Sequence, residues 1–364
     1  MSNITDSVIT NNDVTEHLQQ QVKNAISSRE PLYIHGGNSK SFYGNKVDAK
    51  PLDISQHTGV VSYEPTELCI TVRAGTRLSE IETLLSEHQQ ILPFEPPMYS
   101  ENTTIGGAIA TGISGPRRAY TGSVRDAILG VQIINGDGDI VNFGGQVMKN
   151  VAGYDLSRLM VRSQGTLGVI LNVSLRLLPK PTHDISLGFE ASATEAIEYF
   201  QNLRVQQLPI TATAWHDNQA YIRLSASEAI TQNSQKKLGL EKLNTSGQIW
   251  QEIRDHKHTF FNNFDKPLWR LSLSPAAGNL SNIDDQQLIE WGGAQRWLSS
   301  NAPANIVQGL ISKQGGHATL FRSNVPDTQI FPVLEPVLLT LHKRLKNKMD
   351  PHGIFNPNRI YQGL

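Results

Sequence analysis

Short, mostly apolar runs that are typical of β-strands recur along the first half of the chain. Four such runs occupy residues 31–35, 68–74, 127–134 and 169–177. A glycine-containing turn follows or precedes each run, so the pattern predicts strands that enter tight turns. Two apolar stripes at helical spacing, one near each end of the chain, predict helices. They consist of Val14, Leu18, Val22 and Ile26, and of Val337, Leu341 and Leu345.

A change of composition at residues 179–181 suggests a domain boundary. The sequence Pro-Lys-Pro stands there, and beyond it glycine becomes rarer while helix and strand patterns mix. Runs that alternate like strands of one antiparallel sheet occupy residues 268–273, 294–298 and 318–322. We therefore expect a first domain over residues 1–180, a cap domain over 181–330, and a C-terminal helix and tail over 331–364.

The stretch from Thr104 to Asp126 is rich in glycine and hydroxyl side chains, as phosphate-binding loops are. Thirteen of the 29 glycines lie between residues 100 and 170, and glycine lets a backbone approach an anion closely with its N–H groups turned one way. Clustering of this kind favours one ligand bound at several backbone points. A glycine-rich surface loop without a ligand is the alternative, and this stretch alone does not decide between them.

A second donor-rich turn, Gly36-Gly-Asn-Ser-Lys-Ser41, follows the strand-like run at 31–35. A strand that runs into such a turn can cradle a pyrophosphate. The turn is not a Walker P-loop, because that motif requires glycine immediately before Lys-Ser/Thr and Ser39 occupies that position. No GxGxxG follows a strand in the sequence either, so the chain does not predict a Rossmann site.

The composition narrows the functional classes. The chain has 364 residues, of which 38% are hydrophobic and 18% charged, with a net charge of -1, so nothing draws it to nucleic acid or to an anionic membrane. Cys69 is the only cysteine, which excludes intrachain disulfides and cysteine-based redox or zinc sites. No apolar run reaches the ~20 residues of a membrane span, and the N-terminus lacks a signal-peptide pattern. We therefore expect a cytoplasmic protein that reaches the inner membrane only through partners.

Several short motifs, in their order and spacing, give the chain a resemblance to flavoproteins of the vanillyl-alcohol oxidase type. The motifs are His35–Ser39, Val72–Gly75, Pro96–Pro97, Thr104–Gly107, Asp126–Gly138, Gly165–Ile170 and Asp350–Pro357. Within this group the chain is most similar to the FAD-binding subunits of bacterial glycolate oxidases (glycolate dehydrogenases). That closer likeness rests on the short length, the variant turn Gly36–Phe42, the run Lys149–Met160 and the segment Gly315–Arg322.

The resemblance implies an α+β fold with a PCMH-type FAD-binding domain of two α+β subdomains. An α+β cap domain with an antiparallel sheet would follow, and the C-terminal tail would return to the FAD domain. FAD is the implied cofactor, bound non-covalently because no histidine or cysteine stands where some relatives attach it. A heteromeric complex is also implied, in which this chain works beside a larger flavin subunit and an iron–sulfur subunit. That complex would oxidise glycolate, a 2-hydroxy acid, to glyoxylate and pass the electrons onward.

Carried onto this sequence, the family pattern gives two sets of cofactor-binding residues. The FAD pyrophosphate would lie against His35, Gly36, Gly37, Asn38, Ser39 and Lys40, and against Thr103, Thr104, Gly106 and Gly107. The flavin side would be lined by Pro97, Gly112, Ser114, Gly115, Gly165, Thr166, Gly168 and Ile170. Inward N–H groups and short hydroxyl side chains suit two phosphates, and a flat, mostly apolar bed suits the flavin ring. Asn38 and Ser39 replace the usual third glycine and threonine of the first turn.

Candidates for catalysis lie near the end of the expected cap domain. His317 could take the hydroxyl proton of a substrate and Arg322 could hold its carboxylate, although a structural histidine and ordinary salt bridges explain the same residues. Arg117 and Arg118 are further candidates for the carboxylate. The larger subunits of this kind carry a Gly-Glu-His-Gly motif for metal and substrate, and Gly316-His-Ala318 lacks its acidic residue. No His/Asp/Glu cluster has metal-ligand spacing, so no metal site is expected.

Two alternatives to a catalytic subunit stay open from the sequence. One is a stand-alone FAD-dependent dehydrogenase of the same fold, such as one for D-lactate or an enolpyruvyl-sugar reductase. The other is a non-catalytic assembly or regulatory subunit of the complex that binds FAD weakly or not at all. Tyr154 and Asp155 are candidates to approach a flavin, and Lys149-Asn150 to position the loop that carries them.

Overall fold

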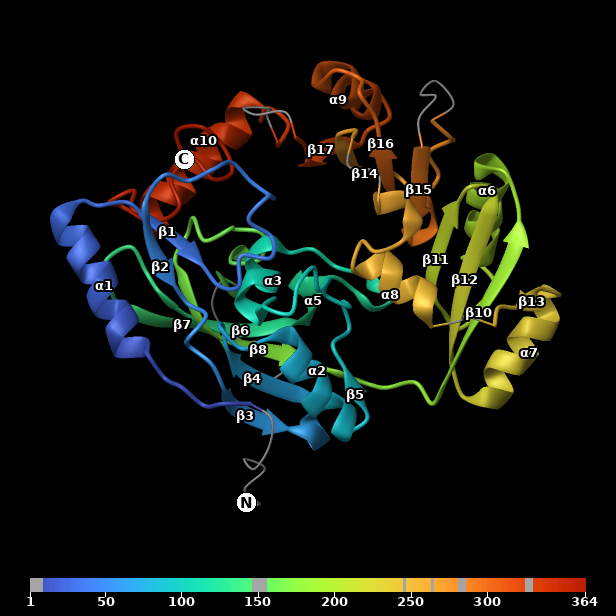
Figure 1. The fold of residues 1–364 in the computed structure, drawn as a ribbon, viewed down its shortest axis with the longest axis horizontal. Coiled ribbons are helices and arrows are strands. Elements are labelled where there is room, and N and C mark those ends of the chain that lie inside the picture. Colours follow the sequence, from blue (N-terminus) through green and yellow to red (C-terminus); the bar gives the residue numbers. More distant parts are fainter. Residues whose placement is uncertain (1–8, 146–155, 245–246, 263–264, 281–285, 325–329) are drawn as a thin grey trace. The chain divides into compact units, whose positions relative to one another are not determined.

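The computed structural model describes two compact units. It covers residues 9–145, 156–244, 247–262, 265–280, 286–324 and 330–364. The first unit comprises residues 1–113, 123–180 and 333–364, and the second comprises 114–122 and 181–332. The candidates Lys149, Asn150, Tyr154 and Asp155 lie outside the described residues. Both units combine helices with antiparallel sheets (Figure 1).

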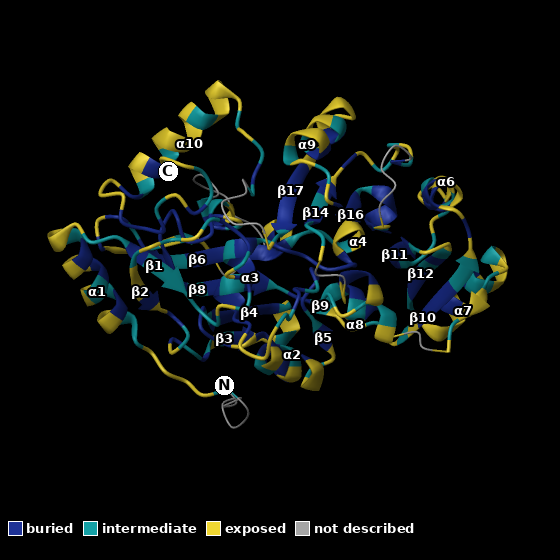
Figure 2. Ribbon diagram, turned by 45° about the horizontal axis from the view of Figure 1, so that its top comes forward, coloured by how far each residue is buried: buried dark blue, intermediate teal, exposed yellow. Residues whose placement is uncertain are grey.

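A five-stranded antiparallel sheet forms the centre of the first unit, in the order β3-β4-β8-β6-β7. Its strands are β3 (Val60–Glu64), β4 (Cys69–Arg73), β6 (Ile128–Ile134), β7 (Ile140–Gly144) and β8 (Val169–Arg176). The continuous apolar runs of β4, β6 and β8 are buried (Figure 2), as expected for strands covered on both faces. The hairpin expected after residue 127 is confirmed as β6 and β7.

Two smaller sheets complete the β-structure of the first unit. β1 (Leu32–His35) pairs in parallel with β2 (Lys50–Asp53), and β5 (Gln90–Ile91) pairs with β9 (Leu178–Pro179). On its other side β1 receives the C-terminal tail, through a parallel bridge between Leu32 and Phe355. The tail thereby lies beside one of the first strands of the chain.

Helices pack onto these sheets and share one core with them. They are α1 (Thr15–Ser28), α2 (Leu78–Glu87), α3 (Ile105–Thr111), α5 (Val124–Ala127) and α10 (Pro336–Met349), with short 3-10 helices η1 (Pro65–Glu67) and η2 (Leu156–Leu159). The stripe expected near the N-terminus is confirmed as α1, which buries Leu18, Val22 and Ala25. α10 starts at Pro336, but Val337 and Leu341 are exposed (72% and 51%), so only Leu345 and Met349 of that helix pack against the core.

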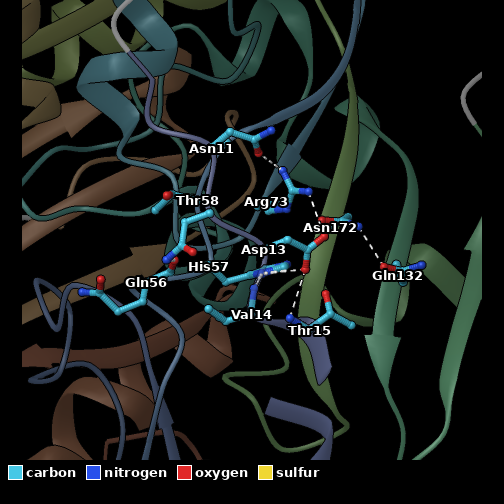
Figure 3. Close-up of polar contacts among 12 residues, drawn as sticks. Asn11, Asp13, Val14, Thr15, Gln56, His57, Thr58, Arg73, Gln132 and Asn172 are labelled. Atoms are coloured by element: carbon cyan, nitrogen blue, oxygen red, sulfur yellow. Dashed lines mark hydrogen bonds and ion pairs between the residues drawn. The ribbon is translucent and has the colours of Figure 1, made fainter. Parts of the chain in front are cut away.

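A polar network fastens the segment before α1 to the central sheet (Figure 3). Arg73, the last residue of β4, donates to Asn11 and to Asp13 Oδ2, the latter over 2.8 Å. Hydrogen bonds from Thr15, followed by the Arg73 guanidinium, lower the pKa of Asp13. The Val14 N–H donates to Nδ1 of the fully buried His57 (3.3 Å). Burial lowers the pKa of His57, so its ring is held in the neutral form that can accept this bond.

The second unit is built on an eight-stranded antiparallel sheet in the order β13-β10-β12-β11-β15-β16-β14-β17. The strands are β10 (His183–Glu190), β11 (Ile210–His216), β12 (Gln219–Ala226), β13 (Glu241–Lys242), β14 (Leu268–Ser272), β15 (Gln286–Glu290), β16 (Gln295–Ser299) and β17 (His317–Arg322). The three alternating runs expected to share one antiparallel sheet are β14, β16 and β17, and they are neighbours.

The two faces of this sheet differ in character. The apolar side chains of one face pack with α6 (Ala193–Leu203) and near α9 (Ala304–Lys313). Elsewhere the sheet carries buried polar groups: Glu290 Oε2 accepts from Gln295 Nε2 and from Trp297 Nε1 at 2.8 and 2.7 Å. The remaining helices are α4 (Arg118–Thr121), α7 (Glu228–Leu238), α8 (Gln248–Arg254), η3 (Thr259–Asn262) and η4 (Trp291–Gly293).

Candidate cofactor-binding site

One cavity of the first unit is lined by the three glycine-bearing turns that lie far apart in the sequence. Its volume is about 780 Å³ when the open solvent at its mouth is included. Its wall is formed by Tyr33, Ile34, His35, Gly36, Gly37, Asn38, Ser39, Lys40, Ser41, Ile54, Ala74, Thr104, Gly106, Gly107, Ala110, Thr111, Gln164, Gly165, Gly168, Ile170, Asn356 and Arg359.

The first turn offers backbone donors to this cavity. β1 ends at His35, and the N–H groups of residues 36–39 make no hydrogen bond to any residue that the structure describes. The side chain of Asn38 is held from outside the turn, because Tyr33 Oη donates to its Oδ1 (3.1 Å). Asn38 also has a positive φ of 53°. Successive N–H groups in such a turn form a concave site for an anion.

The two glycines of the first turn are required by its packing against the second turn. A Cβ on Gly36 would lie 2.5 Å from Thr104 Oγ1, and a Cβ on Gly37 would overlap the Asn102 carbonyl. Neither glycine has a positive φ, so the requirement is one of space and not of backbone conformation. The close approach brings the first turn against the start of α3.

The second turn contributes a wall but few donors, which corrects one expectation. The N–H groups of Ile105 and Gly106 donate to Thr76 O (2.9 Å) and Ala74 O (2.8 Å), and that of Gly107 donates to Thr104 Oγ1 (3.3 Å). Position 106 requires glycine, because a Cβ there would lie 2.7 Å from the Cβ of Ala74. These first N–H groups of α3 are therefore engaged within the protein rather than turned toward a ligand.

The third turn enters β8 through two residues with positive φ, Gln164 (49°) and Gly165 (74°). Gln164 is 7% exposed, and its buried Oε1 accepts no hydrogen bond from a described residue. This oxygen lies beside Gly44, where a Cβ would overlap it. A Cβ on Gly168, which has a φ of 153°, would lie 3.0 Å from Ile133 Cδ1 and from Ile134 O, so packing within the protein favours glycine there.

Two cationic side chains belong to the cavity wall. Lys40 is 6% exposed, and its Nζ lies 5.4 Å from the centre of the Tyr99 ring. Arg359 is 7% exposed, and burial lowers its pKa. Its partners among the described residues are backbone carbonyls and not a carboxylate, so its charge is not neutralised within the protein. Positive charge beside a donor-rich turn suits a diphosphate.

The structure brings most of the expected cofactor residues to this one cavity. Those in its wall are His35, Gly36, Gly37, Asn38, Ser39, Lys40, Thr104, Gly106, Gly107, Gly165, Gly168 and Ile170. Of the others in the first unit, Thr103 donates its hydroxyl to Ser100 O (2.8 Å), Gly112 ends α3 with a φ of 61°, and Thr166 donates its hydroxyl to Ser163 O (2.7 Å). Pro97 is buried outside the wall. Ser114 and Gly115 belong to the second unit.

Sequence reasoning missed the contribution of the C-terminal tail to this wall. Asn356 and Arg359 line the cavity, although neither was among the expected cofactor-binding residues. Gln164 was also missed. The signal available in the sequence was the Asn-Pro-Asn-Arg run, since asparagine tolerates the positive φ that Asn356 adopts (39°).

The candidate catalytic residues stand at opposite ends of β17. His317 is the first residue of the strand and exposed, and Arg322 is the last and half-buried. Five steps along a strand separate them by ~17 Å. Arg322 and Arg270 both lie near the buried His256. Burial, followed by the positive charges of these two guanidiniums, lowers the pKa of His256, so this end of β17 has cationic surroundings. The guanidiniums of Arg118 and Arg270 lie 4.4 and 5.5 Å from the Trp291 ring centre.

Within the described ranges, no three His, Cys, Asp or Glu side chains are grouped so that they could hold a metal ion. No helix in that part of the chain has both the length and the apolar character needed to span a membrane.

Comparison with known proteins decides the family. A protein-family profile described as "FAD binding domain" matches residues 9–144. "Glycolate oxidase subunit GlcE" of Escherichia coli (strain K12) is 45% identical over 352 residues, which is 97% of this chain and 99% of that protein. The chain belongs to the GlcE family. The expected relationship and the expected cofactor, FAD, are confirmed.

Members of related families share shorter regions or only the fold. "D-lactate dehydrogenase [cytochrome], mitochondrial" of Arabidopsis thaliana is 30% identical over 173 residues, which is 47% of this chain and 30% of that protein. The solved structure of p-cresol methylhydroxylase with substrate bound superimposes with a TM-score of 0.72 at 14% identity, over 97% of this chain and 88% of that one. At that identity the likeness concerns the fold alone, and it confirms the expected PCMH-type α+β fold for this GlcE family member.

Proposed function

We propose that this chain is the FAD-binding subunit of a glycolate oxidase (glycolate dehydrogenase) complex, which oxidises glycolate and related 2-hydroxy acids. The observation that carries the proposal is the first turn, whose N–H groups at residues 36–39 are not engaged by described residues and whose residues line the same cavity as Lys40 and Arg359. The relationship to GlcE over nearly the whole length supports the oxidoreductase assignment.

The residues present fit FAD. The donors of the first turn, with Lys40 and Arg359 beside them, would hold the diphosphate. The third turn, with Gly165, Gly168 and Ile170, would provide the flat and largely apolar bed for the flavin ring. Bound FAD supplies the two-electron acceptor for oxidation of an alcohol to a carbonyl. We infer that FAD is held non-covalently.

The second unit provides candidates for substrate binding. Arg322, in its cationic surroundings, would hold the substrate carboxylate through the paired N–H groups of the guanidinium. The alternative places the substrate at His317, which would accept the hydroxyl proton when the C–H bond breaks. Glycolate is too short to reach both residues, which stand ~17 Å apart at opposite ends of β17, so each role is tested by its own variant.

The complex would contain a larger flavin subunit and an iron–sulfur subunit. Two relatives are named as subunits of glycolate oxidase, which supports an assembly of more than one chain. "Glycolate oxidase subunit GlcD" of Bacillus subtilis (strain 168) is 34% identical over 122 residues, and a subunit of that kind is the proposed flavin partner. We place the complex in the cytoplasm, with any attachment to the inner membrane made by partners.

The absorption spectrum of the purified full-length chain tests the cofactor assignment. A yellow protein with flavin bands that fade on addition of glycolate, when the partner subunits are present, supports the proposal. A colourless chain that takes up no FAD would instead make it an assembly subunit. Turnover by the isolated chain would favour the stand-alone dehydrogenase, for which the similarity to D-lactate dehydrogenase is the only specific support.

A further inference from the structure

The C-terminal tail is fixed to the first unit by a buried ion pair. Lys346 of α10 and Asp350 are 7% and 1% exposed, and Lys346 Nζ donates to Asp350 Oδ2 over 2.7 Å. The same ammonium donates to Thr166 O of the third turn (2.8 Å) and to Phe355 O of the tail (2.7 Å). All three N–H donors of the lysine are thus engaged, and the tail is tied to the turn that precedes β8.

Asp350 shapes the tail itself. Its carboxylate accepts from the N–H groups of Ile354 (3.2 Å) and Phe355 (2.8 Å). The tail then runs beside β1, where Leu32 N donates to Ile354 O (2.7 Å) and Asn356 N donates to Leu32 O (3.0 Å). A buried charge pair whose remaining groups are all hydrogen-bonded holds one geometry.

Asn356 joins the first turn to the third. Its Oδ1 accepts from the N–H of Ile34 (2.7 Å), one residue before the last of β1. Its Nδ2 donates to Gln164 O (2.6 Å) and, more weakly, to Ile34 O (3.5 Å). The side chain is 2% exposed, and a Cβ on Gly165 would lie 2.6 Å from its Nδ2. One amide group therefore spans the two turns.

Arg359 holds the other flank of the first turn. Its guanidinium donates to Ser41 O (2.9 Å), Tyr43 O (3.0 Å) and Asn45 O (2.6 Å). These carbonyls follow the first turn directly, whereas Ile34 precedes it. The tail consequently grips the first turn on both sides.

We propose that the tail residues 350–359, anchored by the Lys346–Asp350 pair, position the first and third turns of the cofactor cavity before FAD binds, with Asn356 as the central positioning residue. The inference rests on the proposed cofactor site. The hydrogen bonds from the tail to the two turns lie within the chain, so they are present in the FAD-free protein. They lower the entropy cost of ordering the turns when the cofactor binds.

The test replaces Asn356 by glycine in the full-length chain. Glycine keeps the positive φ of 39° at no steric cost and removes only the side chain. The matched control is Asn358→Gly, because Asn358 is the same residue type, also has a positive φ (61°), and is exposed. Its side chain reaches Gly363 N and neither turn.

Amide hydrogen exchange in the FAD-free protein and the Kd for FAD are measured for both variants. In Asn356→Gly, exchange in segments 32–36 and 163–167 is expected to be about tenfold faster and the Kd about tenfold higher, because the hydrogen bonds that join Ile34 and Gln164 through this side chain are lost. Asn358→Gly is expected to match the parent. A second variant, Arg359→Met, should accelerate exchange at residues 41–45 and leave residues 163–167 unchanged.

Several results would overturn the inference. One is exchange and Kd in Asn356→Gly that stay within about twofold of the parent. Another is an equal loss in Asn356→Gly and Asn358→Gly, which would indicate general destabilisation. If Asn356→Gly does not fold, Arg359→Met decides. Amide exchange that accelerates throughout the first unit, and not only at residues 41–45, would then overturn the inference. A parent chain that binds no FAD would refute only the cofactor assignment. The exchange measurements, made without FAD, would still decide whether the tail positions the two turns.

Discussion

Replacing Gly37 by alanine is expected to weaken FAD binding about 10- to 100-fold. The added methyl group would overlap the carbonyl of Asn102, and that carbonyl belongs to the backbone, which cannot rotate away as a side chain could. The first and second turns would have to move apart. Because Gly37 does not have a positive φ, alanine brings no backbone strain of its own.

The size of the effect follows from the steric contact. Inserting a methyl group into a closely packed site costs ~1–3 kcal/mol, and each ~1.4 kcal/mol changes a dissociation constant tenfold. The displacement falls on the N–H groups of residues 36–39, which are the donors offered to the diphosphate. The strain is present in the free chain too, so the melting temperature should fall together with the affinity, and the loss of affinity comes from the displaced donors.

Titration of the FAD-free chain with FAD, followed by quenching of flavin fluorescence, gives the Kd, and a thermal melt gives the stability. Gly309→Ala is the matched control, because Gly309 lies in α9 and a Cβ there meets nothing within 4 Å. That variant should bind FAD as the parent does and melt slightly higher, since alanine favours a helix over glycine by ~1 kcal/mol. A Gly37→Ala chain that binds FAD as tightly as Gly309→Ala would show that the first turn does not contact the cofactor.

Four further outcomes are expected. The protein should lose thermal stability as the pH falls from 7 to 5, because unfolded His57 is protonated below ~6.5 while the folded pKa is lowered by burial; melting curves of His57→Asn should show a smaller pH dependence. A second loss should follow below pH ~4, since the pKa of Asp13 is also lowered in the folded state, and Asp13→Asn should not show it. Arg322→Ala should raise KM for glycolate at least ~10-fold in the assembled complex, and His317→Ala, ~17 Å away along β17, should then leave KM and kcat unchanged; a fall of kcat in His317→Ala alone would move the substrate site to the other end of the strand. Acid precipitation should release all the FAD into the supernatant, and flavin retained in the pellet would contradict non-covalent binding.

The sequence was most informative where local chemistry decides the structure. The strand that ends at His35 and the donor-rich turn after it were recognisable because glycine, asparagine and serine have few other uses in that order. The alternation of β14, β16 and β17 likewise predicted one antiparallel sheet. That three distant turns would share one cavity did not follow from these patterns, and it was expected only through the resemblance to known flavoproteins.

The sequence was least informative where the partner of a residue lies far along the chain. Asn356 bonds to Ile34, 322 positions away, and no local periodicity records such a contact. Gly106 was expected to turn its N–H toward a ligand, but it is small because Ala74 packs against it. His317 and Arg322 illustrate a different limit: residues close in sequence are far apart when an extended strand joins them.

The pairing of the tail with β1 sets an order of events during biosynthesis. The strand that contains Leu32 is synthesised long before Phe355, which pairs with it. A nascent chain therefore carries the glycine turns for some time without the segment that fixes them, and its nucleotide site stays incomplete until residues 350–359 have been made. Flavin loading should accordingly follow synthesis of that segment.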